Sequence, residues 1–318
     1  MVTTSAIDIL ERALRRKGDL LDVLLIDQTT KKNIVWATDS YFSRGKEFAS
    51  KKAISPDLVT GVYDRLIQPR AAKSLREQRF RTKEKAEVFT PLKVVDQMNK
   101  LMDWSGDIQL PDKSNWKDYV RELKLEICCG EAPFIVSRYN PTAHTRHIIK
   151  LENRVGFLDH KLRIVSRYCH KHKEWLQWAK VAYESSYGYE WQGDNVLIAR
   201  ENLLYTLIDY YKVKFGRSPS LAVQREFAEI ISWNIFQMDG IKYVVPMSCH
   251  HEIRAVPGEL TLFGETPDTV EKDECEGCKF NQPTKHNGKY VQIMDWNTDK
   301  PINFVSLVNK IRKYLEPA

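Results

Sequence analysis

The interpretation of the fold depends on residues 125–134, LEICCGEAPF. The apolar start, the glycine and the following acid and proline are typical of a strand that runs into a tight turn and then a helix. Glycine at such a turn lets the backbone approach a ligand closely. The two adjacent cysteines also suit a metal site. The stretch alone therefore does not distinguish a cofactor turn from a metal site or an ordinary loop.

The segments that follow continue the alternation of strand and helix. Residues 151–216 are mostly helical in pattern, interrupted by the short aromatic strand SYGYEWQG (186–193), and a further helix leads to a turn at MDG (238–240). This order predicts an α/β domain with a largely parallel sheet. Ligands of such sheets bind at the carboxyl ends of the strands.

A capped helix is expected just before this region, after the loop AEVF (86–89). Thr90 is a good N-cap residue and Pro91 a good first helical residue. Val94, Met98 and Leu101 follow at helical spacing. The pattern therefore predicts an amphipathic helix.

Nearer the N-terminus we expect a helix over residues 5–17 and a β-hairpin whose turn is DQTTKKN (27–33). Residues 65–85 concentrate eight arginines and lysines against two glutamates. Such a segment is either a solvated helical face or a contact for phosphates of a nucleic acid.

Bulk composition limits the class of protein. The chain has 318 residues, 42% of them hydrophobic, and a net charge of +7, which suits ordinary solubility or a polyanionic partner. No apolar run is long enough to cross a bilayer, and the N-terminus lacks the apolar region of a secretory signal. We therefore expect a cytoplasmic protein with no membrane partner and with reduced cysteines.

Three of the six cysteines lie in the C-terminal tail, as Cys249 and the C-x-x-C pair Cys275 and Cys278. This spacing lets two thiolates bind one tetrahedral ion, so we expect a structural Zn²⁺ site, with unliganded thiols as the alternative. The candidates for the fourth ligand are His250, His251 and His286, of which we take His251.

EICCGEAPF resembles the cofactor motif of amino-methylating DNA methyltransferases, D-P-A-C-G-S-G-x-F. Glu126 stands at the position of the acid, Cys129 and Gly130 match the Cys-Gly pair, and Phe134 matches the aromatic residue. Glu131 and Ala132 replace the family's Ser and Gly. The resemblance implies that this turn binds S-adenosylmethionine, which has no pyrophosphate and does not need a G-x-G-x-x-G loop.

Three further stretches follow in the family's order. AEVFTP, with Phe89, Thr90 and Pro91, resembles the loop that contacts the methionine part of the cofactor. YGYEWQGDN (187–195) resembles the second strand, which implies that Glu190 accepts hydrogen bonds from the ribose hydroxyls. NIFQMDG (234–240) resembles the next strand end, which implies that Asp239 accepts from the adenine amino group. The whole chain is similar to M subunits of restriction–modification systems.

The family's catalytic tetrapeptide, (Asp, Asn or Ser)-Pro-Pro-(Tyr or Phe), is missing from the sequence. The nearest strings are YNPT (139–142) and FNQPT (280–284). MDWN (294–297) follows a strand-like run and offers an acid beside an aromatic residue, so it is a candidate for a diverged equivalent. The catalytic residues are thus left unassigned.

Together these observations predict an α/β, class I S-adenosylmethionine-dependent (Rossmann-like) domain over 86–246. It would follow an N-terminal hairpin-bearing extension (1–85) and precede a zinc-binding tail (247–318). The resemblance implies an adenine-N6 DNA methyltransferase that acts on double-stranded DNA, with restriction or specificity subunits as partners. One alternative is a catalytically degenerate subunit that binds the cofactor and DNA. Another is a methyltransferase for RNA or protein.

Overall fold

The computed structural model describes residues 11–103, 111–143, 147–256, 260–261, 264–265 and 269–315. The α-helices are α1 (Glu11–Arg15), α2 (Leu20–Leu25), α3 (Leu75–Lys85), α4 (Leu92–Asp103), α5 (Trp116–Arg121), α6 (Phe157–Tyr168), α7 (His172–Glu184), α8 (Gly193–Phe215), α9 (Leu221–Asn234), α10 (Glu276–Lys279) and α11 (Phe304–Leu315). The strands are β1 (Ile26–Asp27), β2 (Lys32–Asn33), β3 (Lys124–Glu126), β4 (Ser186–Glu190), β5 (Ile235–Gln237), β6 (Glu252–Val256), β7 (Leu260–Thr261), β8 (Gly264–Glu265), β9 (Thr269–Asp273), β10 (Gln292–Asp295) and β11 (Lys300–Asn303). Six short 3₁₀ helices are Phe42–Arg44, Lys46–Phe48, Pro56–Leu58, Gly61–Tyr63, Arg70–Ala72 and Leu151–Asn153.

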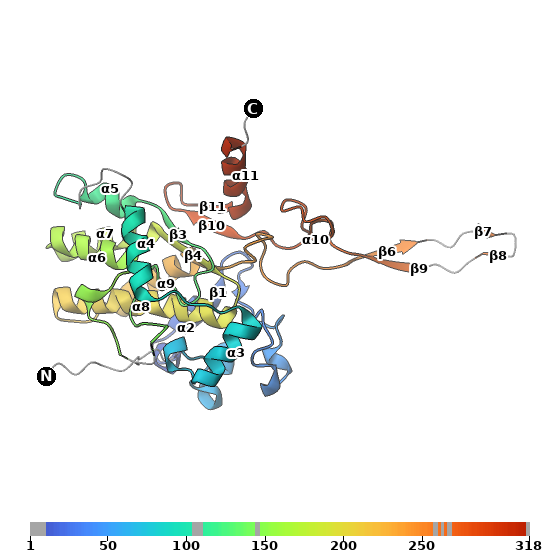
Figure 1. The fold of residues 1–318 in the computed structure, drawn as a ribbon, viewed down its shortest axis with the longest axis horizontal. Helices are drawn as coiled ribbons and strands as arrows, with labels where there is room; N and C mark the ends of the chain where they lie inside the picture. The colour runs from blue at the N-terminus through green and yellow to red at the C-terminus, as the bar shows by residue number, and fades with distance from the viewer. Residues whose placement is uncertain are drawn as a thin grey trace.

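A three-stranded parallel sheet of order β3-β4-β5 lies at the centre of the body (Figure 1). Helices α6 and α7 connect β3 to β4, and α8 and α9 connect β4 to β5. The mixed α/β class with a parallel sheet is therefore confirmed. This strand order is also that of one half of a doubly wound nucleotide-binding sheet. Membership of the methyltransferase class stays a prediction.

Helix α8 joins the N-terminal segment to the sheet. Its side chains are buried along most of its length, and the fully buried Arg200 donates to the carbonyl oxygens of Leu24 and Ile26 on one side and of Ile235 on the other. Leucines of α2 belong to the same buried cluster as α8 and α9. The division between an N-terminal extension and a second domain at residue 85 stays a prediction. Residues on both sides of residue 85 contribute to one hydrophobic core.

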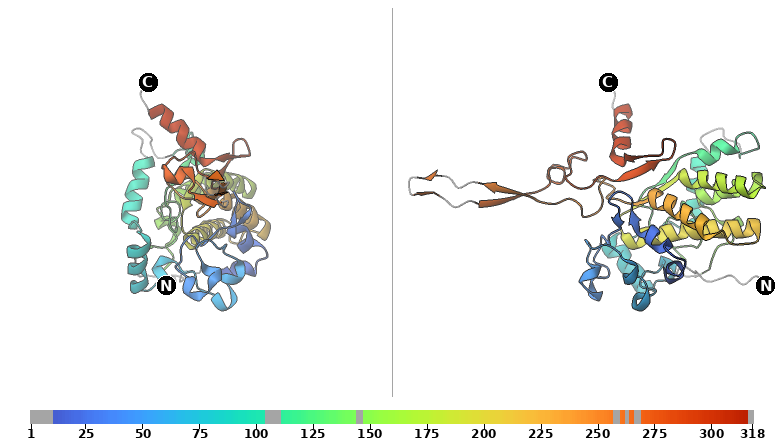
Figure 2. Two further views of the ribbon diagram at one scale, coloured as in Figure 1. Left: turned by 90° about the vertical axis from the view of Figure 1, so that its right-hand side faces the viewer. Right: turned by 180° about the vertical axis from the view of Figure 1, so that it is seen from behind.

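The opposite face of the sheet is covered by the C-terminal part of the chain. Tyr189 of β4 and Phe236 of β5 pack against Phe304 of α11, with ring centroids 6.0 and 5.6 Å away. The antiparallel β6–β9 ribbon projects from the body, as Figure 1 and the right-hand view of Figure 2 show.

Two local predictions differ from the structure. The first run of the predicted hairpin, residues 20–25, forms helix α2, so the β1–β2 pair has only two residues in each strand. The helix predicted after Gly130 is absent from residues 131–143, which form turns. Cys128, Gly130 and Ala132 have positive φ, and a helix cannot continue through such residues.

Candidate functional site

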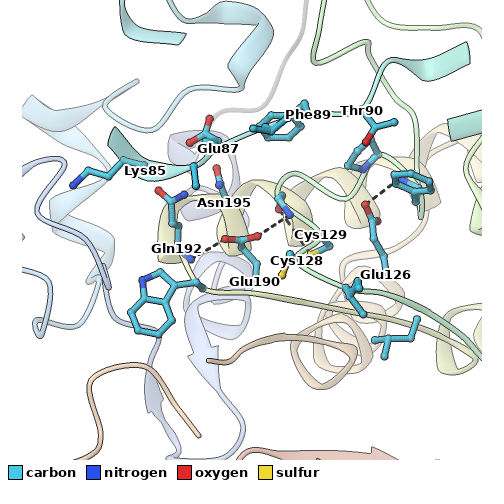
Figure 3. A pocket seen from close by; sticks show the side chains of 18 of the residues that line it. Lys85, Glu87, Phe89, Thr90, Glu126, Cys128, Cys129, Glu190, Gln192 and Asn195 are labelled. Carbon is cyan, nitrogen blue, oxygen red and sulfur yellow. Dashed lines mark hydrogen bonds between the residues drawn. The ribbon is translucent and has the colours of Figure 1, made fainter. Parts of the chain in front are cut away.

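A cavity of about 790 Å³ lies at the carboxyl ends of β3 and β4. Its walls come from the turn after β3, the end of β4, the start of α8 and the segment 83–90. Figure 3 shows Phe89 across the cavity from Cys129 and Glu190. This is the edge of a parallel sheet where ligands are expected to bind.

Seven of the nine residues predicted to bind the cofactor line this cavity: Phe89, Thr90, Glu126, Cys129, Gly130, Phe134 and Glu190. Pro91 lies just outside it. Helix α4 begins at Leu92, one residue later than predicted, and the Pro91 carbonyl accepts from the Val94 and Val95 amides. Asp239, the ninth residue, lines a separate cavity.

The acids at the two strand ends hold the turn in place. Glu190 Oε2 accepts from the Gly130 amide at 2.9 Å, and its Oε1 accepts from the Gln192 amide at 3.0 Å. Glu126 accepts from the Phe134 and Ile135 amides at 3.3 and 3.1 Å. Each carboxylate oxygen can accept a second hydrogen bond, so both acids keep acceptor capacity for a ligand.

Burial raises the pKa of both acids, and their mutual repulsion adds to the rise for Glu126. Hydrogen bonds from backbone amides oppose the rise in each case. A cationic ligand in the cavity would stabilise the ionised carboxylates. Binding of a ligand that carries positive charge would therefore be coupled to loss of protons from these two acids.

Both the backbone conformation at residue 130 and the contact with Phe89 require a glycine there. Its φ is +54°, and a Cβ at this position would lie 3.0 Å from Cε1 of Phe89. The Phe89 ring therefore packs directly on the turn, and the Arg70 guanidinium lies 5.3 Å from the ring centroid. The loop AEVF and the turn after β3 thus meet in space.

The outer wall of the cavity is apolar, which the sequence did not indicate. It is formed by Met98 and Met102 of α4 with Leu125 and Ile127 at the end of β3. The predicted amphipathic helix is thus only partly buried: Val95 is fully buried, but Met98 is 47% exposed and Leu101 70% exposed. Asn99 also holds the helix, because its amide donates to two backbone carbonyls.

Gln192 and Asn195 also line the cavity and were not selected from the sequence, although both lie in the quoted stretch YGYEWQGDN. The only available signal was their position directly after the acid at the strand end.

The basic segment 65–85 is partly internal. Arg81 is buried and donates to Glu87 at 2.5 Å and to Asp194 at 2.7 Å. Arg70 lies beside Glu87, and Lys73 is buried. Arg70 and Arg81 thus pair with acids of the protein itself, and the exposed cations of the segment are Arg65, Arg76, Arg79 and Lys83.

The stretch MDWN lies at the opposite end of the sheet. Met294 accepts from the hydroxyl of Tyr187 near the start of β4, and the Trp296 indole donates to Asn234, which precedes β5. These contacts are at the amino ends of the strands. Residues 294–297 therefore cannot act on a ligand in the cavity.

A second cavity of about 410 Å³ lies at the end of β5. Asp239 and Trp191 line it, and Trp191 also lines the first cavity. Asp239 Oδ1 accepts from the Ile241 and Lys242 amides at 3.0 and 3.1 Å, which closes the turn predicted at MDG.

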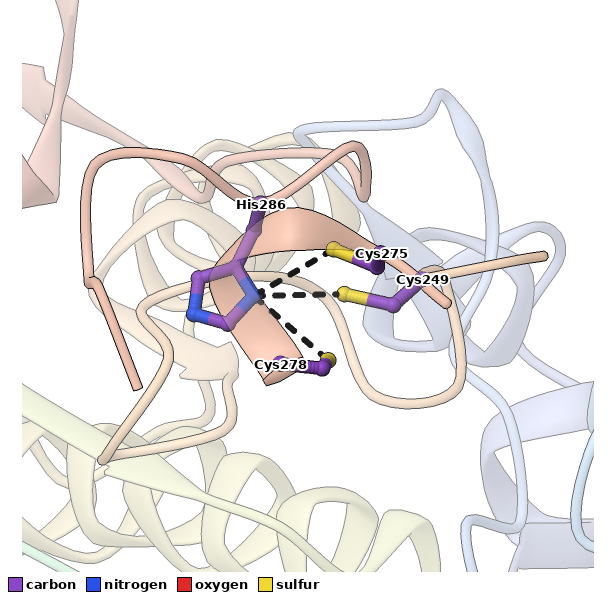
Figure 4. Close-up of side chains that lie close together, drawn as sticks. All are labelled: Cys249, Cys275, Cys278 and His286. Atoms are coloured by element: carbon purple, nitrogen blue, oxygen red, sulfur yellow. Dashed lines mark hydrogen bonds between the residues drawn. The ribbon is translucent and has the colours of Figure 1, made fainter. Parts of the chain in front are cut away.

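Cys249, Cys275, Cys278 and His286 converge in the tail (Figure 4). The three sulfurs lie 3.7, 3.7 and 3.6 Å from Nδ1 of His286. A tetrahedral ion with metal–sulfur bonds of about 2.3 Å and a metal–nitrogen bond of about 2.0–2.1 Å places S and N about 3.5 Å apart. This cluster could therefore hold a metal ion.

The fourth side chain of the cluster is thus His286 and not the expected His251, which is exposed at the rim of the second cavity. Spacing from the C-x-x-C pair could not separate the three histidines. Gly277 makes room for His286, because a Cβ there would lie 2.6 Å from its Nδ1. The Asn287 amide and the Lys242 ammonium donate to sulfurs of the cluster at 3.2 and 3.4 Å, as groups around metal-bound thiolates do.

Within the described part of the chain, no helix is both long and apolar enough to span a bilayer. Comparison with protein-family models found no match, and searches of curated proteins and of solved structures found no significant similarity.

Proposed function

We propose that the first cavity binds S-adenosylmethionine and that the chain is the M subunit of an adenine-N6 DNA methyltransferase. One observation carries the proposal. Seven residues chosen from three separate stretches of sequence, for resemblance to cofactor motifs, line a single cavity at the carboxyl ends of two parallel strands. Neither composition nor helical periodicity predicts that these stretches are neighbours in the fold.

The properties of the cavity fit this cofactor. A volume of about 790 Å³ is within the range of pockets that enclose ligands of this size. Glu126 and Glu190 would accept from the ligand's ammonium and hydroxyl groups, and a cationic ligand would favour their ionised forms against the effect of burial. Met98 and Phe134 would exclude water from the remaining surface.

When bound, the cofactor would supply a methyl group on a sulfonium. Transfer to the adenine amine would form a C–N bond and break the C–S bond, with the bonding electrons left on sulfur and one amine proton lost to solvent. The residues of this chain would bind and orient the two reactants and exclude water. Target adenine would have to leave the duplex first.

A second candidate function is a subunit that binds the cofactor and DNA but does not transfer the methyl group by itself. The observation that favours it is the location of MDWN at the amino ends of the strands. With that stretch set aside, the sequence offers no replacement for the catalytic tetrapeptide at the cavity.

We propose Zn²⁺ as the ion of the Cys249, Cys275, Cys278 and His286 cluster, because three thiolates and one imidazole are a common structural zinc set. The ion would join the two ends of the β6–β9 ribbon, since Cys249 precedes β6 and Cys275 follows β9. Double-stranded DNA and restriction or specificity subunits are the proposed partners, in the cytoplasm.

The experiment is incubation of the purified chain with tritiated S-adenosylmethionine and mixed-sequence duplex DNA. Label in DNA that is released as N6-methyladenine supports the methyltransferase. Absence of label with intact cofactor binding supports the non-catalytic subunit. Transfer of label to RNA or protein, but not to DNA, would refute both candidates.

A further inference from the structure

The outer edge of strand β3 has no partner strand in the described part of the chain. The sheet has the order β3-β4-β5, so only β4 pairs with β3. We propose that a second polypeptide pairs a parallel strand with β3, completes the sheet and supplies the residues that handle the target base. The last part of this proposal rests on the function proposed above.

The backbone at this edge is oriented for pairing. The Lys124 amide donates to the Ser185 carbonyl at 3.0 Å, on the side of β4. Successive amide groups of a strand point to opposite sides, so the amide and carbonyl of Leu125 point away from β4. An edge strand of this kind is a template for a strand of another chain.

The edge at β5, by contrast, is already covered. The Ile235 carbonyl accepts from the buried Arg200 at 2.8 Å. The same guanidinium donates to the Leu24 and Ile26 carbonyls at 2.6 and 2.8 Å, which holds the N-terminal segment beside β5. Among the described residues, β3 is therefore the edge at which this sheet can be extended.

Apolar residues on one face of the sheet become more exposed toward β3. Phe236 of β5 is 2% exposed and Tyr189 of β4 9% exposed, because both pack against Phe304 of α11. By the register of β3 and β4, Leu125 faces the same side, yet it is 40% exposed, and Ile127 is 66% exposed. Parallel sheets are normally covered on both faces, so the cover of this face ends one strand short.

Exposed apolar side chains surround this edge. They are Met98, Leu101 and Met102 of α4 with Leu123, Leu125 and Ile127. Four of the six form the outer wall of the first cavity, and Leu101 and Leu123 lie outside it. Exposed apolar surfaces of this kind mark sites of interaction.

The strand order indicates what the partner is. In a doubly wound sheet the second half begins with a strand that lies parallel to the first strand of the first half, which is β3 here, and ligands bind at this junction. The first cavity lies at the carboxyl end of β3, as this arrangement requires. Among the described residues after β5, the strands form three separate antiparallel pairs and add none to this sheet. The partner is therefore a chain with parallel strands and covering helices.

The missing catalytic tetrapeptide has a place in this arrangement. Carboxyl ends of parallel strands meet at one edge, so the end of a strand paired with β3 would lie beside the outer wall of the first cavity. A second copy of this chain could not supply the tetrapeptide, because the sequence lacks it. The partner is therefore expected to carry it after a strand.

The first experiment places the photo-cross-linker p-benzoylphenylalanine at residue 123, or at the control residue 213, and expresses each protein in its native cells. Val213 is 76% exposed near the end of α8. We expect residue 123 to cross-link to one protein that carries the tetrapeptide, and residue 213 not to do so. Equal or absent cross-linking at the two positions, or cross-linking only to a second copy of this chain, would overturn the proposal.

The captured protein is then purified and mixed with this chain. Hydrogen exchange at the Leu125 amide should slow in the complex. Leu101→Lys and Leu123→Lys should each weaken the complex about ten-fold or more, because they place a charge in an apolar interface, and Val213→Lys should not. Since Leu101 and Leu123 lie outside the first cavity, both variants should bind S-adenosylmethionine as the wild type does. Equal affinity for the partner in all three variants would overturn the proposal.

Labelled cofactor and duplex DNA separate this inference from the proposed function. Methyl transfer to DNA by the mixed chains, and not by this chain alone, supports the whole proposal. Transfer by this chain alone, or none by the complex, would overturn the role given to the partner's residues. A complex that forms through β3 but does not bind S-adenosylmethionine would refute the proposed function and leave the pairing at β3 standing.

Discussion

Substitution of Gly130 by alanine tests the contact on which the first cavity is built. The backbone at Gly130 has φ +54°, where an L-residue costs about 1–2 kcal/mol. The new Cβ would also lie 3.0 and 3.1 Å from two ring carbons of Phe89, so the ring must move. Overpacking of this kind costs a further ~1–3 kcal/mol.

Gly216 provides a matched control. Its φ is +69°, but a Cβ there would have no neighbour within 4 Å. Gly216→Ala should therefore lower the free energy of unfolding by the backbone cost alone, about 1–2 kcal/mol. The difference between the two variants isolates the contact with Phe89.

The assays are urea denaturation and calorimetric titration with S-adenosylmethionine. We expect Gly130→Ala to be the less stable variant by about 1 kcal/mol or more. It should also bind the ligand at least several-fold more weakly, because Phe89 lines the cavity. Gly216→Ala should bind as the wild type does. Equal stability and equal affinity in the two variants would refute the role given to the Gly130–Phe89 contact.

Three further predictions follow from the same structure. Purified protein should contain about one zinc ion per chain by metal analysis. The variants Cys278→Ser and His286→Ala should lose the ion, and His251→Ala should retain it. Loss of zinc in His251→Ala would contradict the assigned ligand set. Because burial raises the pKa of Glu126 and Glu190, affinity for the sulfonium cofactor should increase as the pH rises above about 5, with release of protons. The stability of the free protein should fall in the same direction, since the native state holds these protons more tightly than the unfolded state. Calorimetry in buffers of different ionisation enthalpy measures the protons, and proton uptake would contradict the prediction. Arg81→Met should lower the free energy of unfolding by about 3–5 kcal/mol, because it leaves Glu87 and Asp194 buried without the Arg81 cation. Arg79→Met, at an exposed site, should lower it by less than about 0.5 kcal/mol. Similar urea midpoints for the two variants would contradict the internal role of Arg81.

The parallel sheet could be predicted because its strands alternate with helical segments and end in recognisable turns. SYGYE ends in Glu190 as expected, and the strand before MDG pairs beside it. The motif residues converge because parallel strands place their carboxyl ends at one edge. The same logic did not extend to residues 131–143, where Glu126 accepts the amides of Phe134 and Ile135 and the chain continues in turns.

Other features depend on contacts that a linear pattern does not carry. Charge density at 65–85 suggested a solvated helical face or a contact for phosphates, yet the partners of Arg81 are the buried acids Glu87 and Asp194. The spacing of Cys275 and Cys278 indicated a metal site, but the identity of the histidine is decided by how the loop after α10 folds back over Gly277. Met98 and Met102 of α4 line a cavity, whereas Val95 of the same helix is buried.

The most direct test of the central claim is equilibrium titration of the wild-type chain with S-adenosylmethionine, beside Glu190→Ala and the distant Asp57→Asn. We expect saturable binding at one site per chain, weakened at least ten-fold by Glu190→Ala, because this substitution removes both the ligand's acceptor and the hydrogen bond that holds Gly130. Asp57→Asn should leave the affinity unchanged. No detectable binding to the wild type, or equal affinity in Glu190→Ala, would contradict the assignment of the cavity to this cofactor.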